Sequence, residues 1–102
     1  SLIYGQVTYE TTCIVCHGET GEGDGPVVGD GKFPAPPSLM TQAARNRTDG
    51  EMYHIISQGR GQMWSYKSQL YPIERWAVIN YVRVLQRAQF PEPQDRKLVS
   101  EK

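Results

Sequence analysis

Two cysteines and a histidine lie close together near the start of the chain, in the stretch CIVCHGETGEGDGP. Cys13 and Cys16 have the C-x-x-C spacing of zinc sites, redox-active disulfides and haem attachment sites, and His17 follows them directly. A zinc site needs four ligands, and the other histidine, His54, has no second ligand pair beside it. A thioredoxin-like site needs alternating strands and helices, a pattern that this sequence lacks. Zinc is therefore excluded and a redox-active disulfide is disfavoured.

Covalent attachment of a c-type haem and a plain structural disulfide are the two interpretations left. In the C-x-x-C-H signature, the thiols of Cys13 and Cys16 add across the two haem vinyl groups, and His17 binds the iron from one side. A disulfide between cysteines so close in sequence closes a very short loop and stabilises a fold little. The motif is short enough to occur by chance, so the rest of the chain has to decide.

An electron-carrying haem also needs a ligand on the other side of the iron, and a methionine thioether there raises the reduction potential. The candidates are Met40, Met52 and Met63. Met52 lies on the apolar side of an expected helix and Met40 follows a proline-rich loop, so core packing accounts for both. Met63 lies in the glycine-flanked stretch RGQMW, where there is little core to fill, and we expect it to be the ligand. His54 falls in mid-helix, and ligation through it is disfavoured.

Helices must position these residues, and the sequence predicts an all-α domain without strands. The spacing of Leu2, Gly5, Tyr9 and Cys13 places them on one face of a first helix that reaches His17. A glycine inside a helix costs up to about 1 kcal/mol relative to alanine. Gly5 therefore indicates the close approach of another element, such as a second helix.

A long loop is predicted next, because the range 18–38 holds six glycines and four prolines. Loops of this length inside a compact domain are usually functional or disordered. The apolar residues Val27, Val28 and Phe33 favour an ordered loop that wraps over something.

Two shorter helices and one long helix complete the domain. The stretch LMTQAARN predicts a short helix, and TDGEMYHIISQG predicts a helix with Thr48 and Glu51 as a capping box and Gly59 at its end. The stretch PIERWAVINYVRVLQRAQ starts at Pro72 and predicts a long amphipathic helix. Its expected apolar residues are Trp76, Val78, Ile79, Val82 and Leu85, and its expected polar residues are Arg75, Asn80, Arg83 and Arg87.

The length and charge of the chain indicate one small domain. We place this domain at residues 1–90 and a polar, proline-containing tail at 91–102. A chain of 102 residues has a marginal core, so we expect a bound group to complete it. Eleven basic residues balance eleven acidic ones, which argues against nucleic acid as a partner. No apolar run reaches the roughly 18 residues of a membrane span, and the start at Ser1 suggests a removed upstream segment.

On these residues the chain resembles a class I cytochrome c domain, and the resemblance covers residues 2–87. It is carried by the stretches CIVCHG, GEGDGP, TDGEMYHIISQGRGQM and ERWAVINYV. It implies an all-α cytochrome c fold, in which the N- and C-terminal helices cross and shorter helices and loops wrap around one haem. Gly5 and Tyr9 match the family's contact residues on the first helix, and Val78 and Tyr81 match their partners on the last.

The resemblance also implies how the haem is held and what it does. Cys13 and Cys16 would attach one haem c, with His17 and Met63 as axial iron ligands, in a domain that carries electrons and is not itself an enzyme. The family's ligand methionine is commonly followed by proline, whereas Trp64 follows it here. If Met63 does not bind iron, the alternative is a haem domain with an open sixth position, acting as a small-ligand sensor or as part of an enzyme.

The stretch PPSL matches the Pro-x-Leu element that the family places beside the proximal histidine. The resemblance implies that the carbonyl of Pro37 accepts a hydrogen bond from Nδ1 of His17, and that Leu39 packs against the haem. Pro34 and Pro36 match this role less well. A loop merely stiffened by Pro36 and Pro37 is also compatible with the sequence.

Within the family, the stretches GDGP, DGEMYHIISQGRGQM and ERWAVINYV resemble bacterial monohaem domains attached to membrane respiratory complexes, especially the cytochrome c subunit of alternative complex III, and similar domains fused to haem–copper oxidases. This narrower resemblance implies redox partners, namely a quinol-oxidising respiratory complex and a haem–copper oxidase. It also implies a location in the periplasm or on the outer face of the cytoplasmic membrane. Association with the membrane is expected through an upstream anchor or a partner subunit.

Overall fold

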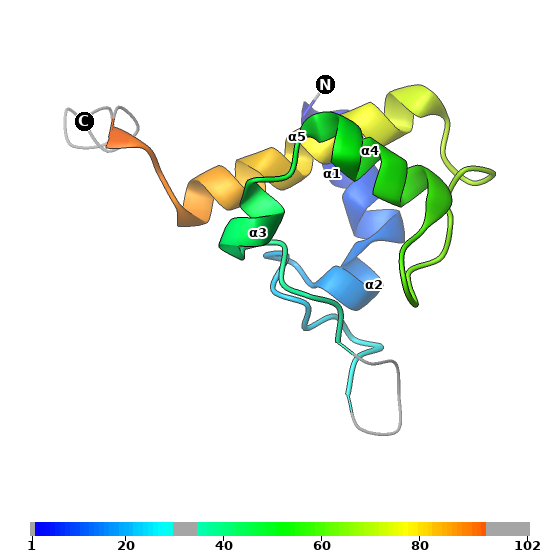
Figure 1. Ribbon diagram of the computed structural model, residues 1–102, viewed down its shortest axis with the longest axis horizontal. Coiled ribbons are helices and arrows are strands. Elements are labelled where there is room, and N and C mark those ends of the chain that lie inside the picture. Colours follow the sequence, from blue (N-terminus) through cyan, green and yellow to red (C-terminus); the bar gives the residue numbers. More distant parts are fainter. Residues whose placement is uncertain (1, 30–34, 94–102) are drawn as a thin grey trace.

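The protein is built from helices joined by long connections (Figure 1). The computed structural model describes residues 2–29 and 35–93, and these contain five helices and no strand. The helices are α1 (Leu2–Thr12), α2 (Ile14–His17), α3 (Gln42–Arg45), α4 (Asp49–Gln58) and α5 (Pro72–Gln89). The predicted all-α class is confirmed. None of these helices has both the length and the apolar character that crossing a bilayer requires.

The contact between α1 and α5 is the centre of the fold. Figure 1 shows α5 as the longest helix, with α1 and α4 lying across it. A Cβ atom on Gly5 would lie 2.1 Å from the backbone oxygen of Ala77, so the two backbones approach this closely only because residue 5 has no side chain. One turn further along α1, the ring of Tyr9 packs against Tyr81 with 5.4 Å between the centroids. The predicted crossing of the first and last helices is therefore present.

A small apolar core lies where α1, α4 and α5 meet. Its buried members are Tyr9, Met52, Val78, Ile79 and Val82. Burial of a side chain of this size contributes about 1.5–3 kcal/mol, so five such residues are a modest core for a domain. Cys13, Ile14 and Leu39 pack against its edge. Two residues expected to contact a haem, Cys13 and Leu39, thus border the core.

The first predicted helix is divided at Cys13, which lies between α1 and α2. Its backbone N–H still donates to the carbonyl of Tyr9 at 2.8 Å, so the helical path continues through the junction. Leu2 was predicted on the packed face and is instead 53% exposed, whereas Gly5 and Tyr9 further along α1 are buried.

The faces of α5 differ from the prediction at two neighbouring positions. Arg75, expected on the polar face, is buried and only 7% exposed, whereas Trp76, expected on the apolar face, is 43% exposed. Trp76 stacks on Tyr53 with 4.3 Å between the ring centroids, so one side of its ring is covered. Arg75 is surrounded by hydrogen-bond acceptors, and a cation can be buried when its donors are satisfied.

The ends of the helices follow the capping signals of the sequence. The hydroxyl of Thr48 accepts from the backbone N–H of Glu51 at 3.1 Å, and the Glu51 carboxylate accepts from the backbone N–H of Thr48 at 2.8 Å. Gly59 ends α4 with φ 78°, and α5 starts at Pro72 as predicted. Phe33, one of the apolar residues that favour an ordered loop, Pro34, and residues 94–102 of the predicted tail lie outside the described residues.

Candidate functional site

Helices α1 and α2 place the two cysteines and the histidine on consecutive backbone turns. The backbone N–H groups of Cys16 and His17 both donate to the carbonyl of Cys13, at 3.3 and 3.0 Å. Both thiols are half-buried and free, so no disulfide joins them. Burial, followed by the nearby Cys16, raises the pKa of Cys13 to about 12, which keeps this group in the thiol form at neutral pH. Two free thiols one turn apart are what addition to two haem vinyl groups requires.

The imidazole of His17 is neutral, and one of its nitrogens has no hydrogen-bond partner in the described part of the chain. Burial lowers the pKa of His17, so the ring is uncharged at neutral pH, which is the form that binds a metal. Its Nδ1 atom is buried and has no hydrogen-bond partner in the described part of the chain. A buried polar atom without a partner costs about 1–3 kcal/mol. Nδ1 is thus available for the bond to a backbone carbonyl that the sequence predicts, and the other ring nitrogen is left to bind a metal. A neutral imidazole directly beside two free thiols is a donor set that fits a haem.

The glycine-rich stretch after His17 folds back onto the cysteine turn. The backbone N–H of Gly23 donates to the carbonyl of His17 at 2.9 Å, and that of Gly25 donates to the carbonyl of Cys16 at 3.1 Å. A Cβ atom on Gly25 would lie 2.1 Å from the carbonyl oxygen of Val15, so a side chain there would push the loop away. The glycines let the loop satisfy the carbonyl groups at the end of α2, which would otherwise be unpaired.

The proline-rich end of the loop returns to the same region. The carbonyl of Pro36 lies against Gly23, where an added Cβ atom would be 2.6 Å from its oxygen. Leu39 is half-buried and packs against the apolar core, and its backbone N–H donates to the carbonyl of Gly21 at 2.7 Å. The two sides of the loop are therefore held together at their base, beside the cysteine turn.

Pro37 is exposed, and no hydrogen bond joins its carbonyl to Nδ1 of His17 in this structure. Its predicted role in orienting His17 therefore stays a prediction. The neighbouring residue Pro36 is half-buried and contacts the loop segment whose Gly23 bonds to the carbonyl of His17.

Met63 lies in a tight turn between α4 and α5. Its backbone N–H donates to the carbonyl of Arg60 at 2.9 Å, the reverse bond measures 3.1 Å, and Gly61 at the tip has φ 57°. Met63 is half-buried, whereas Met40 and Met52 are buried with exposures of 5% and 8%. The turn thus holds the one methionine of the three that is not buried. Its bond to iron stays a prediction.

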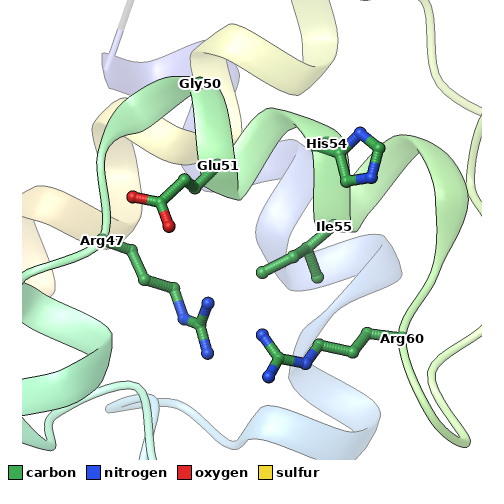
Figure 2. A pocket seen from close by; sticks show the side chains of 6 residues that line it. All are labelled: Arg47, Gly50, Glu51, His54, Ile55 and Arg60. Atoms are coloured by element: carbon green, nitrogen blue, oxygen red, sulfur yellow. The ribbon is translucent and has the colours of Figure 1, made fainter.

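A cavity of about 380 Å³ opens beside α4 (Figure 2). Its lining residues are Arg47, Gly50, Glu51, His54, Ile55 and Arg60. Arg47 precedes α4 and Arg60 follows it, and in Figure 2 their guanidinium groups point toward one another across the cavity. The sequence interpretation did not select these two arginines; their positions at the two ends of the capped helix are the signal that would have found them.

The charge of this cavity suits a carboxylate. Two guanidinium groups face it, and the single carboxylate in its lining, Glu51, already accepts a hydrogen bond from the backbone of Thr48. Arginine binds carboxylates through two parallel N–H donors, so Arg47 and Arg60 would suit the two propionates of a haem. His54 lies in the lining and is exposed.

Comparison with known proteins identifies the same class of domain. Residues 3–82 match the protein family described as "Cytochrome C oxidase, cbb3-type, subunit III". Among solved structures, the chain is similar to the KustC0563 c-type cytochrome with 23% identity and a TM-score of 0.66, covering 80% of this chain and 96% of that one. This similarity concerns the fold. No curated protein sequence matches the chain.

A second solved structure is similar over part of its length. It is the Kuenenia stuttgartiensis reducing HAO-like protein complex Kustc0457/Kustc0458, with 25% identity and a TM-score of 0.69. The similarity covers 87% of this chain but only 44% of that one, so the chain spans less than half of its length.

Proposed function

The chain belongs to the family of cytochrome c oxidase cbb3-type subunit III and is a c-type cytochrome domain, and we propose that it transfers electrons through a single haem c. In this proposal Cys13 and Cys16 would hold the haem covalently, and His17 and Met63 would be the ligands of its iron. The observation that carries the proposal is the half-buried, neutral His17 directly beside two free thiols that lie one helical turn apart.

Each of these residues contributes to electron transfer through its position. The haem supplies an iron that alternates between the ferric and ferrous states. Neutral His17 offers a nitrogen lone pair without first losing a proton, and the folded loop behind it limits the movement of its backbone. Met63 stands on a hydrogen-bonded turn, so its thioether can be presented with little rearrangement. Two fixed ligands leave the iron's surroundings nearly unchanged when the charge changes, which favours fast transfer.

Arg47 and Arg60 would hold the propionates and neutralise their charge. Removing the net negative charge near an iron centre favours the reduced state, because that state carries one positive charge less. These arginines would therefore help to keep the reduction potential high, in the same direction as the methionine ligand.

We further infer that the domain works within a larger respiratory assembly, on the periplasmic or outer face of the cytoplasmic membrane. It would receive electrons from a quinol-oxidising complex and pass them to a haem–copper oxidase. The family description names an oxidase subunit, and one similar structure is a redox protein complex, which supports partners of this class. Membranes that contain the quinol-oxidising complex should reduce the haem-loaded protein, and membranes with the oxidase should reoxidise it. Failure of both reactions would contradict this assignment.

The test of the haem site combines mass and spectroscopy. Protein matured with haem should gain the mass of one haem, and Cys13→Ser with Cys16→Ser should abolish the gain. The ferric protein should show the weak charge-transfer band of methionine-ligated haem, and Met63→Ala should remove it. Gln62→Ala is the matched control, since it changes an exposed side chain of the same turn.

Two outcomes would contradict the proposal in different ways. A ferric protein with high-spin features and no methionine band would have an open sixth position, as in a small-ligand sensor or an enzyme. A protein that gains no haem mass would be a helical domain with a structural role for its two cysteines.

A further inference from the structure

Arg75 of α5 is a buried cation bonded to several segments of the chain. Only 7% of its surface is exposed. Its Nε atom donates to the carbonyl of Leu70 at 3.0 Å, and its Nη2 atom donates to the carbonyl of Lys67 at 2.7 Å. Its Nη1 atom donates to the hydroxyls of Ser57 at 3.1 Å and Tyr53 at 3.2 Å, both on α4. The guanidinium thus connects α5, α4 and the segment 67–70.

All of these acceptors are neutral. Within the described ranges, no carboxylate lies at salt-bridge distance from Arg75, and the ring of Tyr53 is its aromatic neighbour at 5.4 Å. Burial of a cation without a counter-ion is costly, and a well-packed apolar residue is often as stabilising as a buried charge. What an apolar residue does not provide is a rigid, planar set of donors that fixes several acceptors relative to one another.

The segment fixed by Arg75 is the continuation of the Met63 turn. The backbone N–H of Tyr66 donates to the carbonyl of Ile56 at 2.9 Å, and the hydroxyl of Ser65 donates to the carbonyl of Ser57. At the start of the turn, a Cβ atom on Gly59 would lie 2.5 Å from the carbonyl oxygen of Met63. The turn is therefore pressed against the end of α4, and the bonds of Arg75 secure the chain that leaves it.

We propose that Arg75 is a positioning residue for the thioether of Met63. By fixing the carbonyls of Lys67 and Leu70 to α4 and α5, it sets the place from which Met63 reaches the iron. The inference rests on the proposed ligation by Met63. Loss of Arg75 frees the segment after the turn, so a competing ligand should displace Met63 more easily.

Arg83, two turns further along α5, provides a matched control. Its Nε atom pairs with Asp49 at 3.0 Å, and its Nη atoms donate to the carbonyls of Arg45 and Arg47. It likewise donates to backbone carbonyls and fixes a segment at the start of α4, far in sequence from Met63, although one of its partners is a carboxylate. Loss of either arginine should lower stability, but only loss of Arg75 should weaken the methionine ligand.

The experiment compares haem-loaded wild type, Arg75→Gln, Arg75→Lys and Arg83→Gln. Each ferric protein is titrated with imidazole while the methionine charge-transfer band is followed, and thermal unfolding is measured in parallel. Arg75→Gln should bind imidazole about tenfold more tightly than wild type, equivalent to about 1.4 kcal/mol, while Arg83→Gln should bind it as wild type does. Arg75→Lys keeps the charge without the planar donors and should resemble Arg75→Gln, since the donor geometry is what positions the turn.

Several results would overturn the proposal. Equal imidazole affinities in Arg75→Gln and Arg83→Gln would mean that Arg75 acts only on stability. Wild-type affinity in Arg75→Lys would mean that the charge, and not the planar set of donors, is what matters. If Arg75→Gln does not fold, the comparison of Arg75→Lys with Arg83→Gln decides. Absence of the methionine band in the wild type would instead refute ligation by Met63, on which the inference depends.

Discussion

Replacement of Gly5 by alanine tests the central contact of the fold. The new Cβ atom would lie 2.1 Å from the oxygen and 2.8 Å from the carbon of the Ala77 carbonyl group, and 3.2 Å from Cβ of Tyr81. Restoring a separation of 3.0 Å requires α1 and α5 to move apart by roughly 0.9 Å, the difference between 3.0 and 2.1 Å. A radial gap of 0.5–1 Å forfeits about a quarter to a half of the dispersion energy of the affected contacts.

Two effects of opposite sign determine the size of the change. Alanine favours the helix over glycine by about 1 kcal/mol. Overpacking in a core typically costs about 1–3 kcal/mol, and more when the neighbour is backbone that has no rotamer to change. The contact between Tyr9 and Tyr81 weakens as the helices separate. We therefore expect Gly5→Ala to lower the free energy of unfolding by about 2 kcal/mol, which corresponds to a fall in melting temperature of about 8–16 °C.

The assay is urea unfolding of the haem-loaded protein, followed by circular dichroism. Gly50→Ala is the matched control, because this helical glycine of α4 meets only the hydroxyl of Thr48, at 3.9 Å from the added Cβ atom. It should leave stability unchanged or raise it by up to about 1 kcal/mol. If Gly5→Ala is as stable as wild type, or if both variants lose the same free energy of unfolding, the close approach of α1 and α5 does not require a glycine at position 5.

Three further predictions concern charge, capping and the first loop. Arg47→Gln combined with Arg60→Gln should lower the reduction potential by on the order of tens of millivolts, because the ferric state gains most from losing nearby positive charge; an unchanged or higher potential in voltammetry would refute a propionate site. The bonds from the backbone and side chain of Thr48 lower the pKa of Glu51, so its contribution to stability is present above the ordinary value of 4.5 and is lost as the pH falls below it. Urea midpoints of wild type and Glu51→Gln should therefore differ at neutral pH and converge in acid, and a constant difference would contradict this. Tyr9→Phe keeps the ring but removes the 2.6 Å hydrogen bond from the Tyr9 hydroxyl to the carbonyl of Gly18, and should lower the free energy of unfolding in urea by about 1 kcal/mol. An unchanged free energy of unfolding would contradict a stabilising role for this bond.

The features that depend on local signals were predictable from the sequence. The cap formed by Thr48 and Glu51 needs only four consecutive residues, and Gly59 ends the helix because of its own backbone conformation. The turn that brings Cys13 and Cys16 together is equally local. Each of these signals acts within one or two helical turns, so their recognition does not require the tertiary fold.

The errors arose where distant segments decide the outcome. Burial of Arg75 depends on four hydrogen-bond acceptors within residues 53–70. The spacing of polar and apolar residues along α5 gives no information about these acceptors, because they lie outside this helix. Trp76 is exposed because its partner Tyr53 lies near the surface of another helix. The cavity between Arg47 and Arg60 exists because α4 and the turn after it bring two chain segments together. Such placements follow from packing and not from the order of polar and apolar residues.

The contact between Gly5 and Ala77 joins the beginning and the end of the domain, and this has a consequence for how the chain is made. While the chain is being synthesised, α1 can contact α2 and Gly18 early, but its main partner α5 emerges last. The core between α1 and α5 therefore closes only when nearly the whole sequence has been made. Once closed, the contact encloses every loop that lies between the two helices. Doubling the length of a closed loop costs only about 0.6 kcal/mol of entropy. Insertions in the enclosed loops should therefore be tolerated far better than the removal of a few residues from either end of the domain.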